Sequence, residues 1–159
     1  MKKSMEVAKE APIAYSRLKI SSEGVDGNGF ILSQYTCTGA NINPPLDIEG
    51  VPDGTKSLAI IVDDPDAANG DWVHWVAWNI PVLRHIKEAR AMEAQGLNDL
   101  RQNRYDGPCP PQGVHHYHFK VYALDNLPEL GEKTTKKLLE QAMQGHVLAF
   151  GELIALYER

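Results

Sequence analysis

The chain has 159 residues, of which 43% are hydrophobic and 23% are charged, and these values suit one globular domain with its own core. They exclude a disordered chain, a collagen-like repeat and a coiled coil, and no apolar run approaches the ~20 residues of a membrane-spanning helix. The net charge of −5 comes without a basic cluster, so we expect neither nucleic acid nor an anionic membrane surface as a main partner.

The first residues of the chain are polar. Glu6, Lys9 and Glu10 stand where a secretion signal needs an apolar run. We therefore expect residues 1–14 to form a loosely held leader, residues 15–159 to form a single domain, and the protein to be cytoplasmic. Cys37 and Cys109 could pair, but in a cytoplasmic protein we expect two reduced, buried thiols.

Two strands are expected in the first half of the domain. The apolar run Ser57–Val62 ends at the acidic sequence Asp63-Asp64-Pro65-Asp66. A second strand follows over Trp72–Ile80, where Pro81 stops it. Residues 84–95 are rich in helix formers, which predicts a partly helical insertion there.

The second half begins with a rigid loop over residues 105–113, which holds three prolines and two glycines. Period-two alternation predicts a strand over Val114–Leu124, with its odd positions facing inward. An amphipathic helix is expected over Thr134–Gln144 and a last strand over Val147–Tyr157. Strands dominate and no βαβ alternation is present, so the predicted fold class is mainly β, with one or two helices at the margin.

The first candidate for chemistry is Asp64-Pro65-Asp66, at the end of the first long strand. Pro65 restricts the backbone, so the carboxylates of Asp64 and Asp66 are held in place. The alternative is an ordinary turn, because Asp and Pro are common turn residues.

The second candidate is His74, which shares a strand face with Trp72 and Trp78. A histidine between indoles on a half-buried strand needs partners for its ring nitrogens. The alternative is a core histidine whose hydrogen bonds are satisfied within the fold.

The third candidate is the pair His115 and Tyr117, directly after the proline-rich loop. Residues i and i+2 of a strand lie on one face, roughly 7 Å apart. The alternative is a half-buried pair with its polar tips in water.

If these strands are neighbours, Asp64, His74, His115 and Tyr117 meet in one small polar pocket. Imidazole and phenol groups suit an anion such as phosphate, and Asp64 or Asp66 suits a cationic group on the same ligand. A carboxylate that accepts from a histidine favours the protonated ring, so such a site can become cationic near neutral pH.

Two other site types remain open at this stage. In an enzyme, Cys109 would be the nucleophile, His115 the base and Asp64 the residue that orients it, but Cys109 lies between two prolines and no oxyanion hole is evident. In a zinc site, His116 and His118 on one strand face would be joined by His74 or His115, but His115 points to the opposite face, so a three-histidine site needs a distant third ligand.

The sequence resembles the phosphatidylethanolamine-binding proteins, also called the Raf kinase inhibitor-like family, and most of all their bacterial and archaeal branch. The resemblance extends from about residue 18 to the C terminus. It rests on these stretches: Cys37–Asn41, Pro44–Leu46, Asp63–Ala67, His74–Val76, Asn79–Pro81, Gly96–Asp99, Tyr105–Gly113, His115–Tyr117, Gly145–Ala149 and onward to Tyr157.

The resemblance implies a phosphatidylethanolamine-binding-protein-like fold, with a large antiparallel Greek-key sheet packed on a smaller sheet and one or two peripheral helices. It implies a non-catalytic protein without a cofactor or a metal, whose pocket binds phosphate-type anions and phosphorylated head groups such as phosphoethanolamine. The ligand-binding residues implied are Asp64, Asp66, Trp72, His74, Pro110, Pro111, Gly113, His115 and Tyr117.

The resemblance also bears on partners. Some members regulate a kinase or inhibit a protease, so a protein partner that is bound through the surface, independently of the pocket, is the alternative function. Bacterial relatives often form dimers, which leaves a homodimer open here. This chain departs from the usual family residues at Ile48, Ala68 and Leu100, and these changes concern the shape of the pocket mouth.

Overall fold

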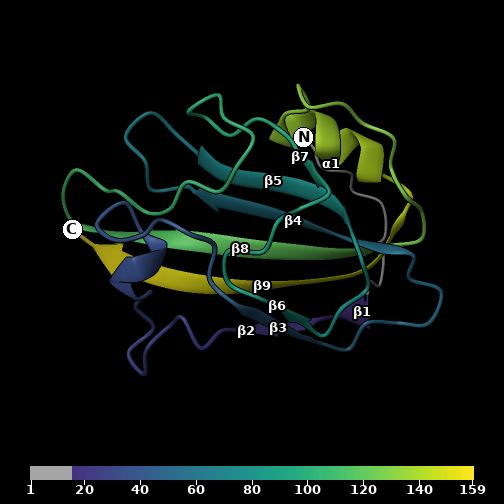
Figure 1. The fold of residues 1–159 in the computed structure, drawn as a ribbon, viewed down its shortest axis with the longest axis horizontal. Coiled ribbons are helices and arrows are strands. Elements are labelled where there is room, and N and C mark those ends of the chain that lie inside the picture. Colours follow the sequence, from purple (N-terminus) through teal and green to yellow (C-terminus); the bar gives the residue numbers. More distant parts are fainter. Residues whose placement is uncertain (1–15) are drawn as a thin grey trace, which may run out of the picture.

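Two sheets face each other across the main core, and a helix covers the outer face of the larger sheet (Figure 1). The computed structural model describes residues 16–159. Its elements in chain order are β1 (Ser16–Arg17), β2 (Lys19–Ser21), the short 3-10 helix η1 (Ser33–Tyr35), β3 (Leu46–Glu49), β4 (Ser57–Asp64), β5 (Trp72–Ile80), β6 (His85–Ile86), β7 (Ala94–Gln95), β8 (Val114–Leu124), α1 (Lys136–Met143) and β9 (Val147–Glu158).

The larger sheet has the strand order β1-β9-β8-β4-β5-β7, and the smaller sheet has the order β2-β3-β6. The long strands β4, β5, β8 and β9 pair antiparallel, as expected for this fold. The edge strand β1 pairs parallel with β9, so the larger sheet is mixed rather than wholly antiparallel.

Strand β4 is buried along its whole length because both of its faces are covered. Leu58, Ile60 and Val62 pack in the main core between the two sheets. Ala59 and Ile61 face the other way, into a second core that α1 closes. A strand covered on both sides needs a continuous apolar sequence rather than an alternating one, as this segment has.

The bounds of β5 and β8 agree with the prediction, and β4 is two residues longer at its end than expected. The odd positions of β8 from Tyr117 onward are buried, as the alternation predicted. Helix α1 is shorter than predicted: Thr135 caps its start by accepting from the Leu138 amide at 3.3 Å, and it buries Leu139 and Met143.

The predicted partly helical insertion over residues 84–95 is wrong. His85–Ile86 pairs with β3, and Ala94–Gln95 pairs with β5. Between them the Tyr35 hydroxyl donates to Glu88 at 2.7 Å. Helix propensity is a weak preference that these contacts with two different sheets override.

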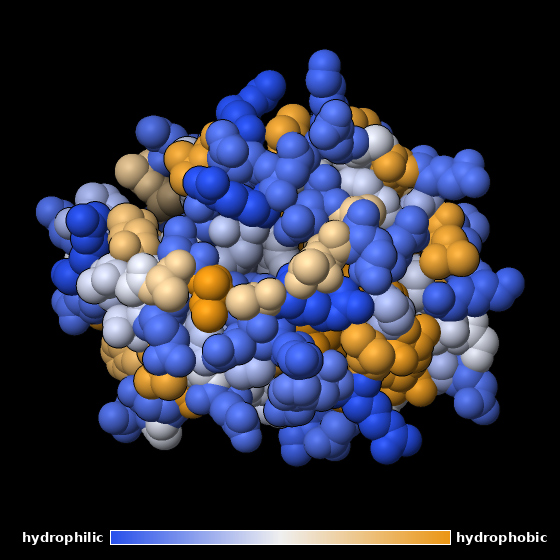
Figure 2. All heavy atoms as spheres, viewed as in Figure 1, coloured by the Kyte–Doolittle hydropathy of each residue, from blue (hydrophilic) through white to orange (hydrophobic). Residues whose placement is uncertain are grey.

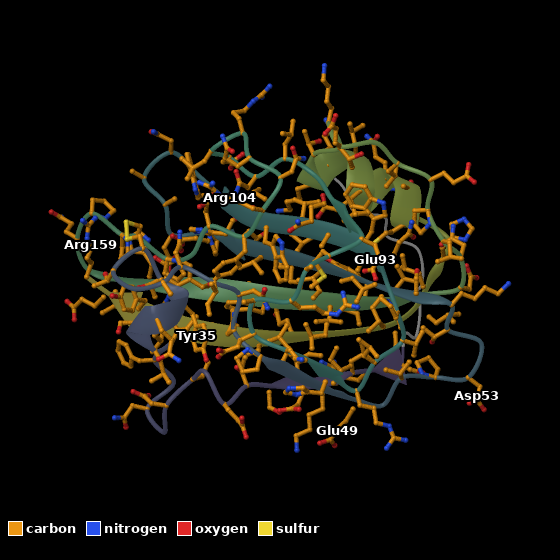
Figure 3. The ribbon with its side chains drawn as sticks, viewed as in Figure 1. Tyr35, Glu49, Asp53, Glu93, Arg104 and Arg159 are labelled. Carbon is orange, nitrogen blue, oxygen red and sulfur yellow. A yellow bond between two sulfur atoms is a disulfide. The ribbon has the colours of Figure 1, made fainter. Side chains whose placement is uncertain are left out.

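The expectation of reduced, buried thiols is also wrong, because Cys37 and Cys109 form a disulfide. Cys109 is exposed and Cys37 is only partly buried. The Cys37 amide donates to the Pro108 carbonyl at 3.1 Å. The disulfide, yellow near Arg159 in Figure 3, therefore joins the loop after η1 to the proline-rich loop. Their separation of 72 residues hides this proximity in the sequence.

The leader predicted over residues 1–14 lies outside the described residues. Within residues 16–159 no helix is long and apolar enough to cross a membrane. Hydrophilic residues cover most of the face seen in Figure 2, and hydrophobic residues form separate groups among them.

Candidate functional site

The candidate site lies at one end of the larger sheet, near the position marked C in Figure 1. Strands β5 and β8 both pair antiparallel with β4, so the end of β4 lies beside the starts of its two neighbours. Loops 64–72 and 98–111 enclose a cavity of about 640 Å³ there. Seven of the nine residues named from the sequence line it: Asp64, Trp72, His74, Pro110, Pro111, His115 and Tyr117.

The Asp64 carboxylate is almost fully buried and orients His115. Its Oδ2 lies 2.7 Å from Nδ1 of His115, and its Oδ1 accepts from the Asp66 amide at 2.8 Å. Both carboxylate oxygens are therefore engaged, and the other ring nitrogen of His115 is left for the cavity. The side chain of His115 retains 13% of its exposure.

His74 is held by the backbone of Asp106. Its Nδ1 lies 2.6 Å from the Asp106 carbonyl oxygen, and the Asp106 amide donates to the His74 carbonyl at 3.2 Å. The residue is only 6% exposed, and its Nε2 has no hydrogen-bond partner in the described part of the chain. Burial lowers the pKa of His74, because a charged ring is poorly solvated there.

Tyr117 lies between the two histidines. Its ring contacts His74 edge-on, with centroids 5.4 Å apart, and stacks on His115 at 6.3 Å. Burial, with the nearby Asp64 charge, raises the pKa of Tyr117 well above its ordinary value, so the phenol keeps its proton. We call Asp64, His74, His115 and Tyr117 the pocket cluster.

A polar network fixes the loop that supplies Asp106. The side-chain nitrogen of Asn98 donates to the Asp106 carboxylate at 2.8 Å. The side-chain oxygen of Asn98 accepts from the backbone amides of Leu100 and Gln102. Arg104 pairs with the same carboxylate at 3.1 Å. Asn41 accepts from the Gly107 amide at 2.7 Å. The position of His74 thus depends on these residues, which do not touch its ring.

Gly107 is required where this loop passes under η1. A Cβ added there would lie 2.2 Å from the Tyr35 carbonyl oxygen, a backbone atom that cannot move aside cheaply. Any larger residue would displace the loop and with it the carbonyl that holds His74.

Apolar side chains form the walls around this polar floor. Trp72 and Leu100 are 39% and 53% exposed, and Pro110 and Pro111 lie on the side of the disulfide. Ala68 and Leu100, two of the three positions where the chain departs from the usual family residues, line the cavity, whereas Ile48 is buried in the main core.

Asp66 and Gly113, the other two residues named from the sequence, do not line the cavity. Asp66 Oδ2 accepts from the His116 amide at 2.8 Å and lies 2.7 Å from its Nδ1. These hydrogen bonds lower the pKa of Asp66. Gly113 has φ +79° and forms the turn that leads into β8.

Neither alternative site type finds support in this geometry. The sulfur of Cys109 is bonded to Cys37, so it is no free nucleophile. His116 pairs with Asp66 and His118 pairs with Glu152, so the two histidines do not converge. Within residues 16–159 no three His, Cys, Asp or Glu side chains are placed to hold a metal.

Sequence reasoning missed the role of Asp106. A buried His74 indicates that some acceptor must approach its ring. The acceptor is a backbone carbonyl, which any residue could supply, so no residue type reveals it.

Both the sequence and the fold of this chain are similar to those of known proteins. The sequence model of the phosphatidylethanolamine-binding protein family matches residues 21–158. A UPF0098 protein of Pyrococcus horikoshii is 53% identical over 154 residues, which cover 89% of this chain and 77% of the relative. A UPF0098 protein of Methanothermobacter thermautotrophicus is 43% identical, over 89% of this chain and 99% of the relative.

Two solved structures are similar over nearly their whole length. A Chlamydia trachomatis protein described as a phosphatidylethanolamine-binding protein homologue has a TM-score of 0.85 and 37% identity, over 90% of this chain and 98% of the other. Escherichia coli YbcL, described as a new member of the mammalian family, has a TM-score of 0.81 and 29% identity, over 92% and 99%. The chain belongs to the phosphatidylethanolamine-binding protein family.

Proposed function

We propose that this member of the phosphatidylethanolamine-binding protein family is a non-catalytic binding protein whose pocket takes a phosphate-type anion or a phosphorylated head group. The observation that carries the proposal is Nε2 of His74, a ring nitrogen that is buried without a partner beside the cavity. Buried polar atoms are nearly always hydrogen-bonded, and an exception in a cavity favours a ligand or water as the missing partner.

The other members of the pocket cluster supply groups suited to an oxyanion. Burial raises the pKa of Tyr117, so its hydroxyl keeps its proton and can donate a hydrogen bond. His115, once protonated, donates from Nδ1 to Asp64 and from Nε2 to a ligand oxygen. Two imidazoles and a phenol around one small cavity can therefore surround a tetrahedral anion.

The walls favour a ligand with more than a bare anion. Trp72, Leu100 and the two prolines offer apolar contact above the polar floor. A phosphorylated head group places its phosphate among the pocket cluster and its carbon atoms against these walls. This division supports a phosphorylated organic ligand as the natural occupant.

Isothermal titration calorimetry with inorganic phosphate and with phosphoethanolamine tests the proposal. We expect His115→Ala to weaken binding by roughly 1.5–3 kcal/mol, the usual contribution of a charge-assisted hydrogen bond. His118→Ala is the matched control, because His118 lies on the same strand but pairs with Glu152 on the other face. Equal affinities of the wild type and the His115→Ala variant would remove the pocket from the proposal.

The remaining functional expectations stay predictions. They are regulation of a kinase or protease, either through the pocket or through a separate surface, and assembly into a homodimer. Cytoplasmic location also stays a prediction, and the disulfide weighs against it because such bonds are uncommon in that compartment outside hyperthermophiles.

A further inference from the structure

The proton on His74 can be assigned from its partner. A carbonyl oxygen only accepts hydrogen bonds, so the 2.6 Å contact with the Asp106 carbonyl requires a hydrogen on Nδ1. A neutral ring with hydrogen on Nδ1 has a lone pair on Nε2. Burial lowers the pKa of this ring, so the neutral form predominates at pH 7. The unpartnered atom is therefore an acceptor, and it lacks a donor.

The surrounding charges do not favour a fully ionised anion either. Among the described residues, the cavity lining contains no lysine or arginine and four aspartates, Asp64, Asp71, Asp99 and Asp106. Arg104 pairs with Asp106 and Lys136 pairs with Asp71 from outside the lining, so Asp64 and Asp99 are the carboxylates without a cationic Lys or Arg partner there. The titratable groups nearest to His74 in the pocket are Asp64 on β4, Asp106 on the loop and Tyr117 on β8, and the charge of Asp63 acts on His74 from the opposite face of the sheet. An oxyanion without a proton would thus place its oxygens against a lone pair and close to carboxylates.

A phosphate group resolves this conflict if it brings a proton. Phosphate monoesters lose their second proton near pH 6, so a singly charged form with one P–OH group is accessible around neutrality. That hydroxyl donates to His74 Nε2, while the remaining oxygens lie beside Tyr117 and His115. Sulfate has nearly the same shape and carries no proton at this pH, so it has no donor to offer.

We propose that the ligand donates a hydrogen bond to Nε2 of His74, so that the pocket binds a phosphate group in its protonated, singly charged form and discriminates against oxyanions that carry no proton. This inference rests on the proposed function and adds the charge state of the ligand. No covalent bond changes; the proton stays on the phosphate oxygen and is shared with the ring nitrogen.

The test is calorimetry of the full chain with inorganic phosphate and with sulfate between pH 5.5 and pH 8, in two buffers that differ in ionisation enthalpy. The buffer dependence of the heat gives the number of protons taken up on binding. We expect phosphate to bind at least about tenfold more tightly than sulfate at pH 6, because sulfate leaves the buried acceptor unpaired. Sulfate binding too weak to measure also supports the proposal.

The decisive quantity is the difference in proton uptake between the two anions, because a proton that the ligand itself carries is taken up with phosphate and not with sulfate. We expect phosphate to take up close to one proton more than sulfate at pH 8 and nearly none more at pH 5.5. The phosphate affinity relative to that for sulfate should fall about tenfold per pH unit above the second pKa of phosphate.

A variant adds a second readout. In His74→Gln a side-chain amide, which can donate, replaces an atom that only accepts, so the preference for phosphate over sulfate should shrink. Thermal unfolding first establishes that this variant is folded, and the wild-type titrations do not depend on it.

Two other outcomes would overturn, respectively, the protonated state of the ligand and the proposed function of the pocket. Equal affinities for both anions, or equal proton uptake with both, would show that the ligand brings no proton and would leave the pocket as an anion site. Failure of both phosphate and phosphoethanolamine to bind at any pH would overturn the proposed function itself, and this inference with it.

Discussion

Asp63 and Asp64 are neighbours at the end of β4, but they face opposite sides of the larger sheet. Asp63 faces α1 and accepts from Lys120 at 3.1 Å and from Lys136 at 2.7 Å. Lys136 also pairs with Asp71 at 2.6 Å. We call Asp63, Asp71, Lys120 and Lys136 the helix-side ion cluster. Asp64 belongs to the pocket cluster, where its partners are His115 and a backbone amide.

The two clusters differ in whether their polar atoms are satisfied. Burial would raise the pKa of Asp63, but the hydrogen bond from Lys136 and the charge of Lys120 outweigh it and lower the pKa. Each charge of the helix-side ion cluster thus has an opposite charge beside it. The pocket cluster keeps Nε2 of His74 without a partner. Complete pairing indicates a structural role, and an unpaired buried atom at a cavity indicates a binding role.

Loss of the disulfide should cause the largest loss of stability, and it should also weaken phosphate binding in the pocket. We expect the Cys37→Ser/Cys109→Ser double variant to lose about 4 kcal/mol of unfolding free energy, because the bond closes a loop of 72 residues. Phosphate affinity should fall as well, since Cys109 lines the cavity. Urea unfolding and calorimetry measure the two effects, and an unchanged unfolding free energy would contradict this prediction.

Breaking the helix-side ion cluster should reduce stability and spare binding. We expect Asp63→Ala to lose about 2–4 kcal/mol of unfolding free energy, because two partly buried lysines are left without their shared carboxylate. Asp53→Ala, at an exposed turn labelled in Figure 3, is the control and should change stability by less than about 0.5 kcal/mol. A large loss of phosphate affinity in Asp63→Ala would show that the two clusters are not separate.

Asp64→Asn should give the opposite pattern. The amide keeps the shape of the side chain but removes the negative charge that favours protonated His115, so phosphate affinity should fall by about 1–2 kcal/mol. The unfolding free energy should change less than in Asp63→Ala. The same pair of measurements, titration and urea unfolding, applies to both variants. If both lose mainly stability, the distinction between the two faces fails.

The smallest expected effect is in the pH dependence of stability. Burial lowers the pKa of folded His74 below its unfolded value of about 6.5, so below that pH the unfolded chain binds the extra proton. Stability should therefore fall as the pH drops from 6.5, by at most about 1.4 kcal/mol per pH unit. The lowered pKa of Asp63 acts in the same direction, but only near and below pH 4.

A comparison of the wild type with His74→Gln isolates this contribution, because the other histidines titrate in both proteins. Urea unfolding at pH 5.5, 6.5 and 7.5 gives the slope of the unfolding free energy against pH for each protein. Equal slopes in the two proteins would mean that His74 is not buried in its neutral form.

Sequence patterns predicted the parts of the fold that depend on local periodicity. The alternation in Val114–Leu124 and the proline after Ile80 located β8 and β5, because these signals act over neighbouring residues. Residues 84–95 were predicted wrongly, because their short strands exist only through pairing with two separate sheets.

The candidate site was predictable to the extent that it depends on strand ends. Asp64, His74, His115 and Tyr117 could be placed together because antiparallel neighbours bring alternate ends side by side. The disulfide could not be predicted, because it joins two loops that are distant in the sequence. The contact of His74 with the Asp106 carbonyl could not be predicted either, because every residue has a backbone carbonyl. The contrast between Asp63 and Asp64 also needed coordinates, because it depends on which face each side chain occupies.

The tryptophans give the protein an optical probe of its own pocket. The chain has three, of which Trp75 and Trp78 are 1% exposed in the core and Trp72 is 39% exposed at the cavity wall. A dissolved quencher such as acrylamide therefore reaches the indole of Trp72 and spares the other two. A molecule seated against that wall shields Trp72 from the quencher, so occupancy can be followed by fluorescence without attaching a dye.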